Sequence, residues 1–140
     1  MSAVCSGLRT YLLTISGVTD LVSTRIRPDA LAQNETFPAV VLSETRSDHM
    51  HTISASAGFV ESLVEVACFS STRLEAESVA EAVRQALQGY TGTAGSETIK
   101  SCILESRDSG YLVPADGSDD GLYVTALDFR IVFSESIPTF

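Results

Sequence analysis

The 140-residue sequence has no tryptophan, only nine basic residues and only two histidines. It contains eighteen acidic residues, so its formal net charge is −9 and its pI is near 4.5. Proteins that bind DNA or RNA through phosphates need clustered lysine and arginine, whereas the basic residues here are scattered. The composition therefore argues against sequence-specific nucleic-acid binding and against binding to an anionic membrane surface.

The sequence also lacks long hydrophobic runs. No stretch approaches the roughly 20 apolar residues that a membrane-spanning helix needs. The N-terminal segment has neither the basic start nor the continuous apolar block of a secretory signal peptide. We therefore expect a protein that is made in a cytoplasm, stays there and has no membrane partner.

The cysteines are few and show no pairing motif. Cys5, Cys68 and Cys102 are odd in number and far apart, with no C-x-x-C pair. Two of them lie in strand-like runs, where cysteine usually acts as a small buried apolar side chain. We expect them to be buried and reduced rather than to bind a metal or act as nucleophiles.

Catalytic signatures are missing as well, since no G-x-S-x-G, H-E-x-x-H, P-loop or G-x-G-x-x-G motif is present. His49 and His51 could together bind a metal, but no third ligand is near them in the sequence. The stretch "DGSDDG" (116–121) matches positions 1, 3, 5 and 6 of a calcium loop, but Leu127 replaces the glutamate of position 12. We predict no catalytic residue, metal or cofactor, with a small metal-dependent enzyme as the alternative.

What the sequence does contain is enough apolar material for a core. Hydrophobic residues make up 44% of the chain, which supports a packed core rather than disorder. Charged residues make up 19%, below the usual fraction of about 25%, which favours buried subunit contacts. A chain of this length is expected to form one domain, residues 1–140.

Two segments have the apolar spacing of amphipathic helices. From residue 2 to residue 15 apolar side chains recur at helical spacing, which predicts the first helix. Thr72 and Glu75 form a capping box before residues 76–87, whose apolar side chains share one face. Gly89 is well placed to end this second, alanine-rich helix.

Apolar runs and alternating patterns predict the strands. Strands are expected at residues 38–46, 59–69, 98–106 and 122–133, with a helical turn at 20–22 and a brief strand at 25–27. In the second run, one face should hold Val60, Val64, Val66 and Cys68, and the other Glu61, Leu63 and Glu65. We therefore predict an α+β fold: a mostly antiparallel sheet of about four or five strands with two main helices packed on one face.

Two polar stretches between these strands are long for the turns of a compact domain. One is "SDHMHTISASAG" (47–58), and the other is "RDSGYLVPADGSDDG" (107–121). Loops of this length are usually functional or disordered, so we expect them to contact partners or other subunits. The candidate contact residues are His49, Met50, His51, Leu112, Asp116, Asp119 and Asp120.

The order of elements resembles the phage tail-completion, or tail-terminator, family of long-tailed bacteriophages and related prophages. The segments that carry the resemblance are "LRTYLLTISGVTDLVSTRIRPDAL", "FPAVVLSETRSD", "VEVACFSSTRLEAESVAEAVRQAL" and "YVTALDFRIVF". The third is the most characteristic, with a strand, a small-residue turn and a helix of the form L-x-A-x-x-V-A-x-x-V-x-x-A-L. The two long polar stretches depart from the family's common pattern.

The resemblance implies a virion structural protein without catalytic residues. Family members assemble as a ring, commonly a hexamer, at the head-proximal end of the tail tube, where they stop tube polymerisation and join the tail to the head connector. The implied partners are further copies of the chain, the major tail tube protein and the head-tail connector protein, with assembly in the host cytoplasm. DNA would pass through the ring, and an acidic chain would not adhere to its phosphates. The alternative is another structural or adaptor protein of the virion neck.

Overall fold

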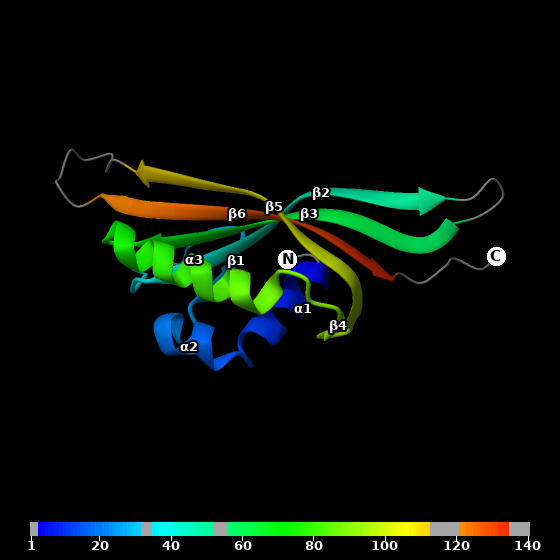
Figure 1. Cartoon of the computed structure of the whole chain (residues 1–140), viewed down its shortest axis with the longest axis horizontal. Coiled ribbons are helices and arrows are strands. Elements are labelled where there is room, and N and C mark those ends of the chain that lie inside the picture. The colour runs from blue at the N-terminus through cyan, green and yellow to red at the C-terminus, as the bar shows by residue number, and fades with distance from the viewer. Residues whose placement is uncertain (1–2, 32–34, 52–55, 113–120, 135–140) are drawn as a thin grey trace.

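The computed structural model describes the chain except residues 1–2, 32–34, 52–55, 113–120 and 135–140. Within these bounds the chain forms three helices and six strands (Figure 1). The helices are α1 (Ala3–Leu12), α2 (Ser16–Val22) and α3 (Arg73–Leu87). The strands are β1 (Ile26–Pro28), β2 (Ala39–His51), β3 (Ser56–Ser70), β4 (Gly92–Ala94), β5 (Glu97–Leu112) and β6 (Leu122–Ser134).

All six strands belong to one curled sheet with the order β1-β2-β3-β6-β5-β4. The β1–β2 pair is parallel and every other pair is antiparallel. The three helices lie on one face of the sheet and leave the opposite face open (Figure 1). The predicted α+β class and the mostly antiparallel sheet are therefore confirmed.

The sheet has more strands than the sequence predicted. The two edge strands, β1 and β4, are only three residues long, and β4 is the one that was not expected. Such short segments carry too few residues to show a period, so only a brief strand near β1 was expected and β4 was missed. The expected turn at 20–22 is the end of a full helix, α2, which begins at Ser16.

The long polar stretches are largely strand rather than loop. In the first stretch β2 continues to its end at His51, and Asp48 and His49 pair with Glu61 and Val60 of β3. In the second stretch β5 continues to Leu112, which pairs with Leu122 of β6. The side chains of residues 47–49 and most of those of residues 107–112 are exposed, so the alternation that reveals a half-buried strand is absent.

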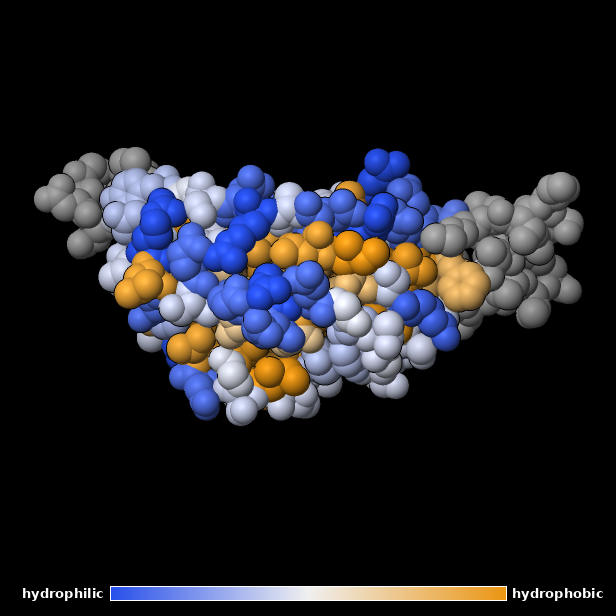
Figure 2. Space-filling view, viewed as in Figure 1, coloured by the Kyte–Doolittle hydropathy of each residue, from blue (hydrophilic) through white to orange (hydrophobic). Residues whose placement is uncertain are grey.

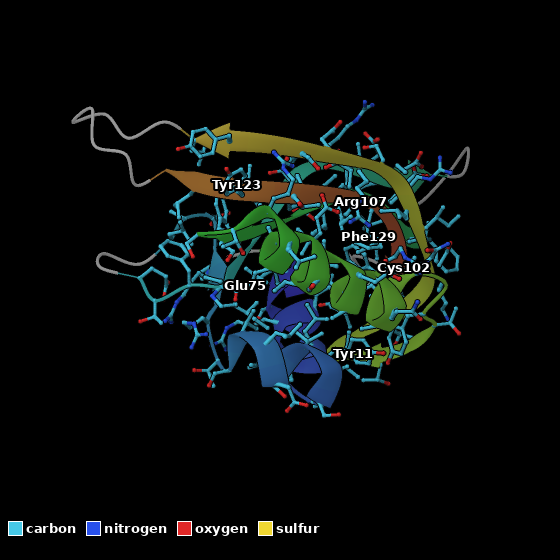
Figure 3. The ribbon with its side chains drawn as sticks, turned by 60° about the vertical axis from the view of Figure 1, so that its left-hand side comes forward. Tyr11, Glu75, Cys102, Arg107, Tyr123 and Phe129 are labelled. Carbon is cyan, nitrogen blue, oxygen red and sulfur yellow. The ribbon has the colours of Figure 1, made fainter. Side chains whose placement is uncertain are left out.

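The core lies between the helix-covered face of the sheet and the helices. The expected alternation of β3 is confirmed, because Val60, Val64, Val66 and Cys68 are buried while Glu61, Leu63 and Glu65 are only partly so. The inward side chains of β6 are Leu127, Phe129, Ile131 and Phe133. Phe129 is fully buried, and Figure 3 shows it on the sheet above α3.

Helix α3 matches its predicted bounds and caps. The Thr72 hydroxyl accepts a hydrogen bond of 3.3 Å from the Glu75 amide, as the capping box requires. The Glu75 carboxylate accepts from the Ser70 hydroxyl, and the Ser70 oxygen in turn accepts from the Thr72 amide. Ser70 therefore links the two halves of the cap. Gly89, at φ +79°, follows the last turn as expected for a helix stop.

The three cysteines are buried, as predicted. Burial raises the pKa of the Cys68 thiol and that of the Cys102 thiol to about 12 in each case. Both thiols therefore stay protonated at neutral pH and act as small core side chains.

Helix α1 touches the β4–β5 turn through backbone atoms. A Cβ atom on Gly7 would lie 2.2 Å from the Ala94 carbonyl oxygen, and one on Gly95 would lie 2.8 Å from the Gly7 Cα. Only glycine permits this approach, because any side chain at either position would collide with backbone. The contact holds the start of the chain against the β4 side of the sheet.

Candidate functional site

The open face of the sheet carries a shallow groove of about 600 Å³. Its lining comes from β2, β3, β5 and β6, the four long strands. The lining residues are Thr45, Arg46, Asp48, Glu61, Leu63, Glu65, Glu105, Ser106, Asp128 and Arg130. Five carboxylates and two guanidinium groups make the groove acidic, which disfavours phosphate binding there.

Ion pairs join most of the charged side chains that line the groove. The Arg130 guanidinium lies 2.9 Å from the Glu105 carboxylate and 4.0 Å from the Glu61 carboxylate, so it bridges β5 and β3 across β6. Arg46 pairs with Asp48 along β2 at 2.9 Å. These side chains are 35–67% exposed, so the pairs contribute little to stability and stay accessible to a partner.

Two carboxylates face each other without a salt-bridge partner among the described residues. Glu65 on β3 is directly opposite Asp128 on β6, and like charges in that position are destabilising. The Ser106 hydroxyl donates to the Asp128 carboxylate at 2.8 Å and relieves part of this repulsion. Within the described residues no group of three histidine, cysteine or acidic side chains is arranged to hold a metal.

A second polar cluster lies between α3 and β5, on the helix-covered face of the sheet. Arg107 of β5, labelled in Figure 3, donates to the Glu77 carboxylate of α3, and its guanidinium lies 3.7 Å from the Glu81 carboxylate. The hydrogen bond from Arg107 lowers the pKa of Glu77. The hydrogen bonds from Arg84 and Gln85 lower the pKa of Glu81 to about 2. The cluster therefore joins α3 to the part of β5 that extends beyond the core.

Large apolar side chains are exposed at both ends of the sheet. At one end Phe59 is 39% exposed; at the other Tyr111 and Leu112 are 45% and 49% exposed. Tyr111 packs at a tilt on Tyr123, whose ring also lies under the Arg73 guanidinium, 5.1 Å away.

Figure 2 also shows an apolar band between the polar rim of the sheet and the polar face of α3. Exposed apolar groups of this kind suit contacts with other protein.

With this geometry in view, the comparison with protein families is decisive. A model of the family described as tail completion protein gp17 matches residues 6–134. The chain belongs to this family. Its members are structural proteins of the bacteriophage tail, so this tail completion protein is a virion structural protein. No curated protein matches its sequence closely enough to be counted as a relative.

A solved structure shares the fold of this tail completion protein. It is a chain from the structure described as the virion of a native gene transfer agent (GTA) particle. The TM-score is 0.63 at 15% sequence identity, over 96% of this chain and 99% of that chain. At this identity the likeness establishes the fold alone.

The structure separates the contact residues that the sequence predicted. His49, Met50 and His51 belong to the end of β2, whereas Leu112 ends β5 at the opposite end of the sheet. Asp116, Asp119 and Asp120 lie outside the described residues. Whether any of these seven residues touches a partner stays a prediction.

Sequence reasoning missed the groove and the Arg107 cluster. Arg107 and Glu77 are thirty positions apart, and no local pattern reveals that they meet. The one available signal is the charge on alternate residues of β6, because alternation in a strand places Asp128 and Arg130 on the same face. In the tail completion protein both side chains line the groove.

In the part of the chain that the structure describes, no helix has the length and apolarity needed to cross a membrane.

Proposed function

We propose that this protein closes the head-proximal end of a phage tail tube as a ring of identical subunits, six in number. There it stops tube polymerisation, binds the major tail tube protein on one side and meets the head-tail connector protein on the other. The family match over residues 6–134 carries this proposal, because it covers nearly the whole chain and names tail completion. The protein would assemble in the host cytoplasm and act by shape, without catalysis or a cofactor.

The charge of the chain fits a ring through which DNA passes. Each copy has a net charge of −9, and the groove on the open face is also acidic. Phosphates would be repelled rather than held, so DNA could move through without sequence-specific binding. The same charge makes the copies repel one another, so the subunit contacts must overcome this repulsion and should respond to salt.

Electron microscopy of the protein mixed with tail tubes assembled from the cognate tail tube protein tests the proposal. We expect a ring at one end of each tube, and tubes that stop lengthening when the protein is added during polymerisation. Tubes that keep growing at the normal rate, with bare ends, would contradict it.

The second candidate is another neck or adaptor protein of the virion, which the same family membership and fold also allow. The two differ in the partner that is bound first. A terminator binds tube ends in the absence of connector, whereas a neck adaptor binds connector and leaves tube ends bare. A pull-down with each purified partner alone distinguishes them.

A further inference from the structure

Two backbone edges on opposite sides of the sheet lack a strand partner. Strand β1 covers β2 only at Val40–Leu42, and β4 covers β5 only at Glu97–Ile99. The Gly89 amide then donates to the Cys102 carbonyl, which extends the covered part of β5 by a few residues. Beyond these points no described strand pairs with the outer side of β2 at Ser43–Asp48, called here the β2 edge, or with the outer side of β5 at Ile103–Asp108, the β5 edge. The inner sides of both segments pair with β3 and β6.

Such edges are ready sites for pairing with another chain, because their amides and carbonyls can continue the ladder. Neither edge contains a proline, which would block pairing. Ile103, at the start of the β5 edge, is 47% exposed on the open face. Some of this apolar surface would be covered by a neighbouring strand.

The two edges lie at the same level along the strand direction, on opposite sides of the sheet. Arg46 is opposite Leu63, Leu63 is opposite Arg130, and Arg130 is opposite Ile103. Three successive antiparallel pairs separate β2 from β5, so the two edge strands run in opposite directions. Rotation about a ring axis keeps the direction of strands that run along that axis. A neighbouring copy would therefore bring its β2 edge antiparallel to the β5 edge at a similar height.

The charges of the two edges are complementary on both faces of the sheet. On the open face Arg46 of the β2 edge and Glu105 of the β5 edge both line the groove. On the helix side the Glu44 carboxylate accepts from the buried Ser62 hydroxyl. Arg107 of the β5 edge points to that same side, toward α3. An antiparallel register that places Arg46 beside Glu105 also places Glu44 beside Arg107, so opposite charges meet twice.

We infer that the β2 edge of one copy pairs antiparallel with the β5 edge of the next, continuing the sheet from subunit to subunit. This inference rests on the proposed ring and names the contact that closes it. The two surfaces differ and every copy offers one of each, so the contact is heterologous and leads to a ring if its rotation closes.

A disulfide across the contact tests the register directly. In the full-length variant Arg46→Cys/Glu105→Cys, mild oxidation of the assembled protein should give a ladder of covalent oligomers on a non-reducing gel. Facing residues of antiparallel strands lie about 5 Å apart, within reach of a disulfide. The native cysteines are buried and contribute no background. Each single variant carries one added cysteine per copy, so its covalent products should be no larger than a dimer.

The matched control is Arg46→Cys/Lys100→Cys. Lys100 is also exposed on β5, but five residues from Glu105 along the strand, or about 17 Å, too far for the bond. A ladder from the first pair and none from the control supports the inference. An equal yield from both, or no ladder from either in protein that caps tubes, would overturn it.

The same experiment separates the inference from the proposed function. Capped tubes without the ladder overturn the edge pairing and leave the terminator function standing. A ladder in protein that never caps tubes supports the edge pairing and removes the terminator function. Protein that stays monomeric both alone and with tubes contradicts both.

Charge reversal gives a second measurement that does not depend on cysteine chemistry. Arg46→Glu and Glu105→Arg should each raise the concentration for half-assembly by roughly fivefold, since each places like charges in contact. The double variant should return to within about twofold of the original value. Lys100→Glu, a charge reversal outside the contact, is the control. Two single effects that simply add in the double variant would contradict the pairing.

Discussion

Arg107 on β5 and Glu77 on α3 form an ion pair that joins the helix to the sheet beyond the hydrophobic core. The Ser109 hydroxyl adds a hydrogen bond of 3.1 Å to the same carboxylate. The pair therefore ties α3 to β5 at the point where β5 extends beyond the core. Since Arg107 also lies in the β5 edge, the position of α3 and the geometry of the proposed subunit contact are linked.

Replacing Arg107 with alanine should lower the free energy of unfolding by less than about 1 kcal/mol, because both partners are about one-third exposed. Urea unfolding followed by circular dichroism measures the change. Arg46→Ala is the control. The Arg46 side chain is 67% exposed and, among the described residues, its ion pair is with Asp48 on its own strand, so no measurable change is expected. A loss of several kcal/mol in the free energy of unfolding of Arg107→Ala would contradict the exposure of the pair.

The dependence of the free energy of unfolding on pH in the acid range should involve Glu77. Its pKa is lowered in the folded protein, first by the hydrogen bond from Arg107, relative to the ordinary value of 4.5. Such a group contributes stability that is fully present above pH 4.5 and is lost as the pH falls through its folded-state pKa. Glu77→Gln should therefore be less stable than the original protein near pH 7, with the difference shrinking below pH 4.5. Chemical unfolding at several pH values measures this, and a difference independent of pH would contradict it.

Gly7→Ala should destabilise the protein, although alanine usually favours a helix interior. The new Cβ would lie 2.2 Å from the Ala94 carbonyl oxygen, so α1 or the β4–β5 turn must move. We expect a loss of about 1–3 kcal/mol in the free energy of unfolding. Gly17→Ala in α2 is the matched control, because nothing lies within 4 Å of its new Cβ, and it should be neutral or stabilising. Equal behaviour of the two variants would rule out the backbone contact.

Shortening the β2–β3 hairpin tests whether its end contacts a partner. Deleting residues 49–56 leaves Asp48 paired with Glu61, with residues 57–60 as the turn, so the domain should still fold. We expect the shortened protein to lose tube capping or ring formation, as judged by electron microscopy. Full retention of both would show that His49, Met50 and His51 make no necessary contact.

The sequence predicted the elements wherever one face is buried. The alternation of β3 and β6 and the apolar stripe of α3 are visible because their inward side chains pack on each other. At Asp48 and Leu112 both faces of the strand are exposed, and the pattern disappears although the backbone pairing continues. The candidate contact residues were therefore assigned to loops when four of them lie at strand ends.

By itself, the sequence determined the α+β class, the bounds and N-cap of α3 and the inward faces of β3 and β6, because these depend on local propensity and the burial of alternating side chains. Only the tertiary structure decided that β6 lies between β3 and β5, that Arg130 bridges Glu61 and Glu105, and that the β2 and β5 edges are uncovered. These features depend on pairing between distant segments, and such pairing is chosen by the packing of the whole sheet rather than by any local pattern.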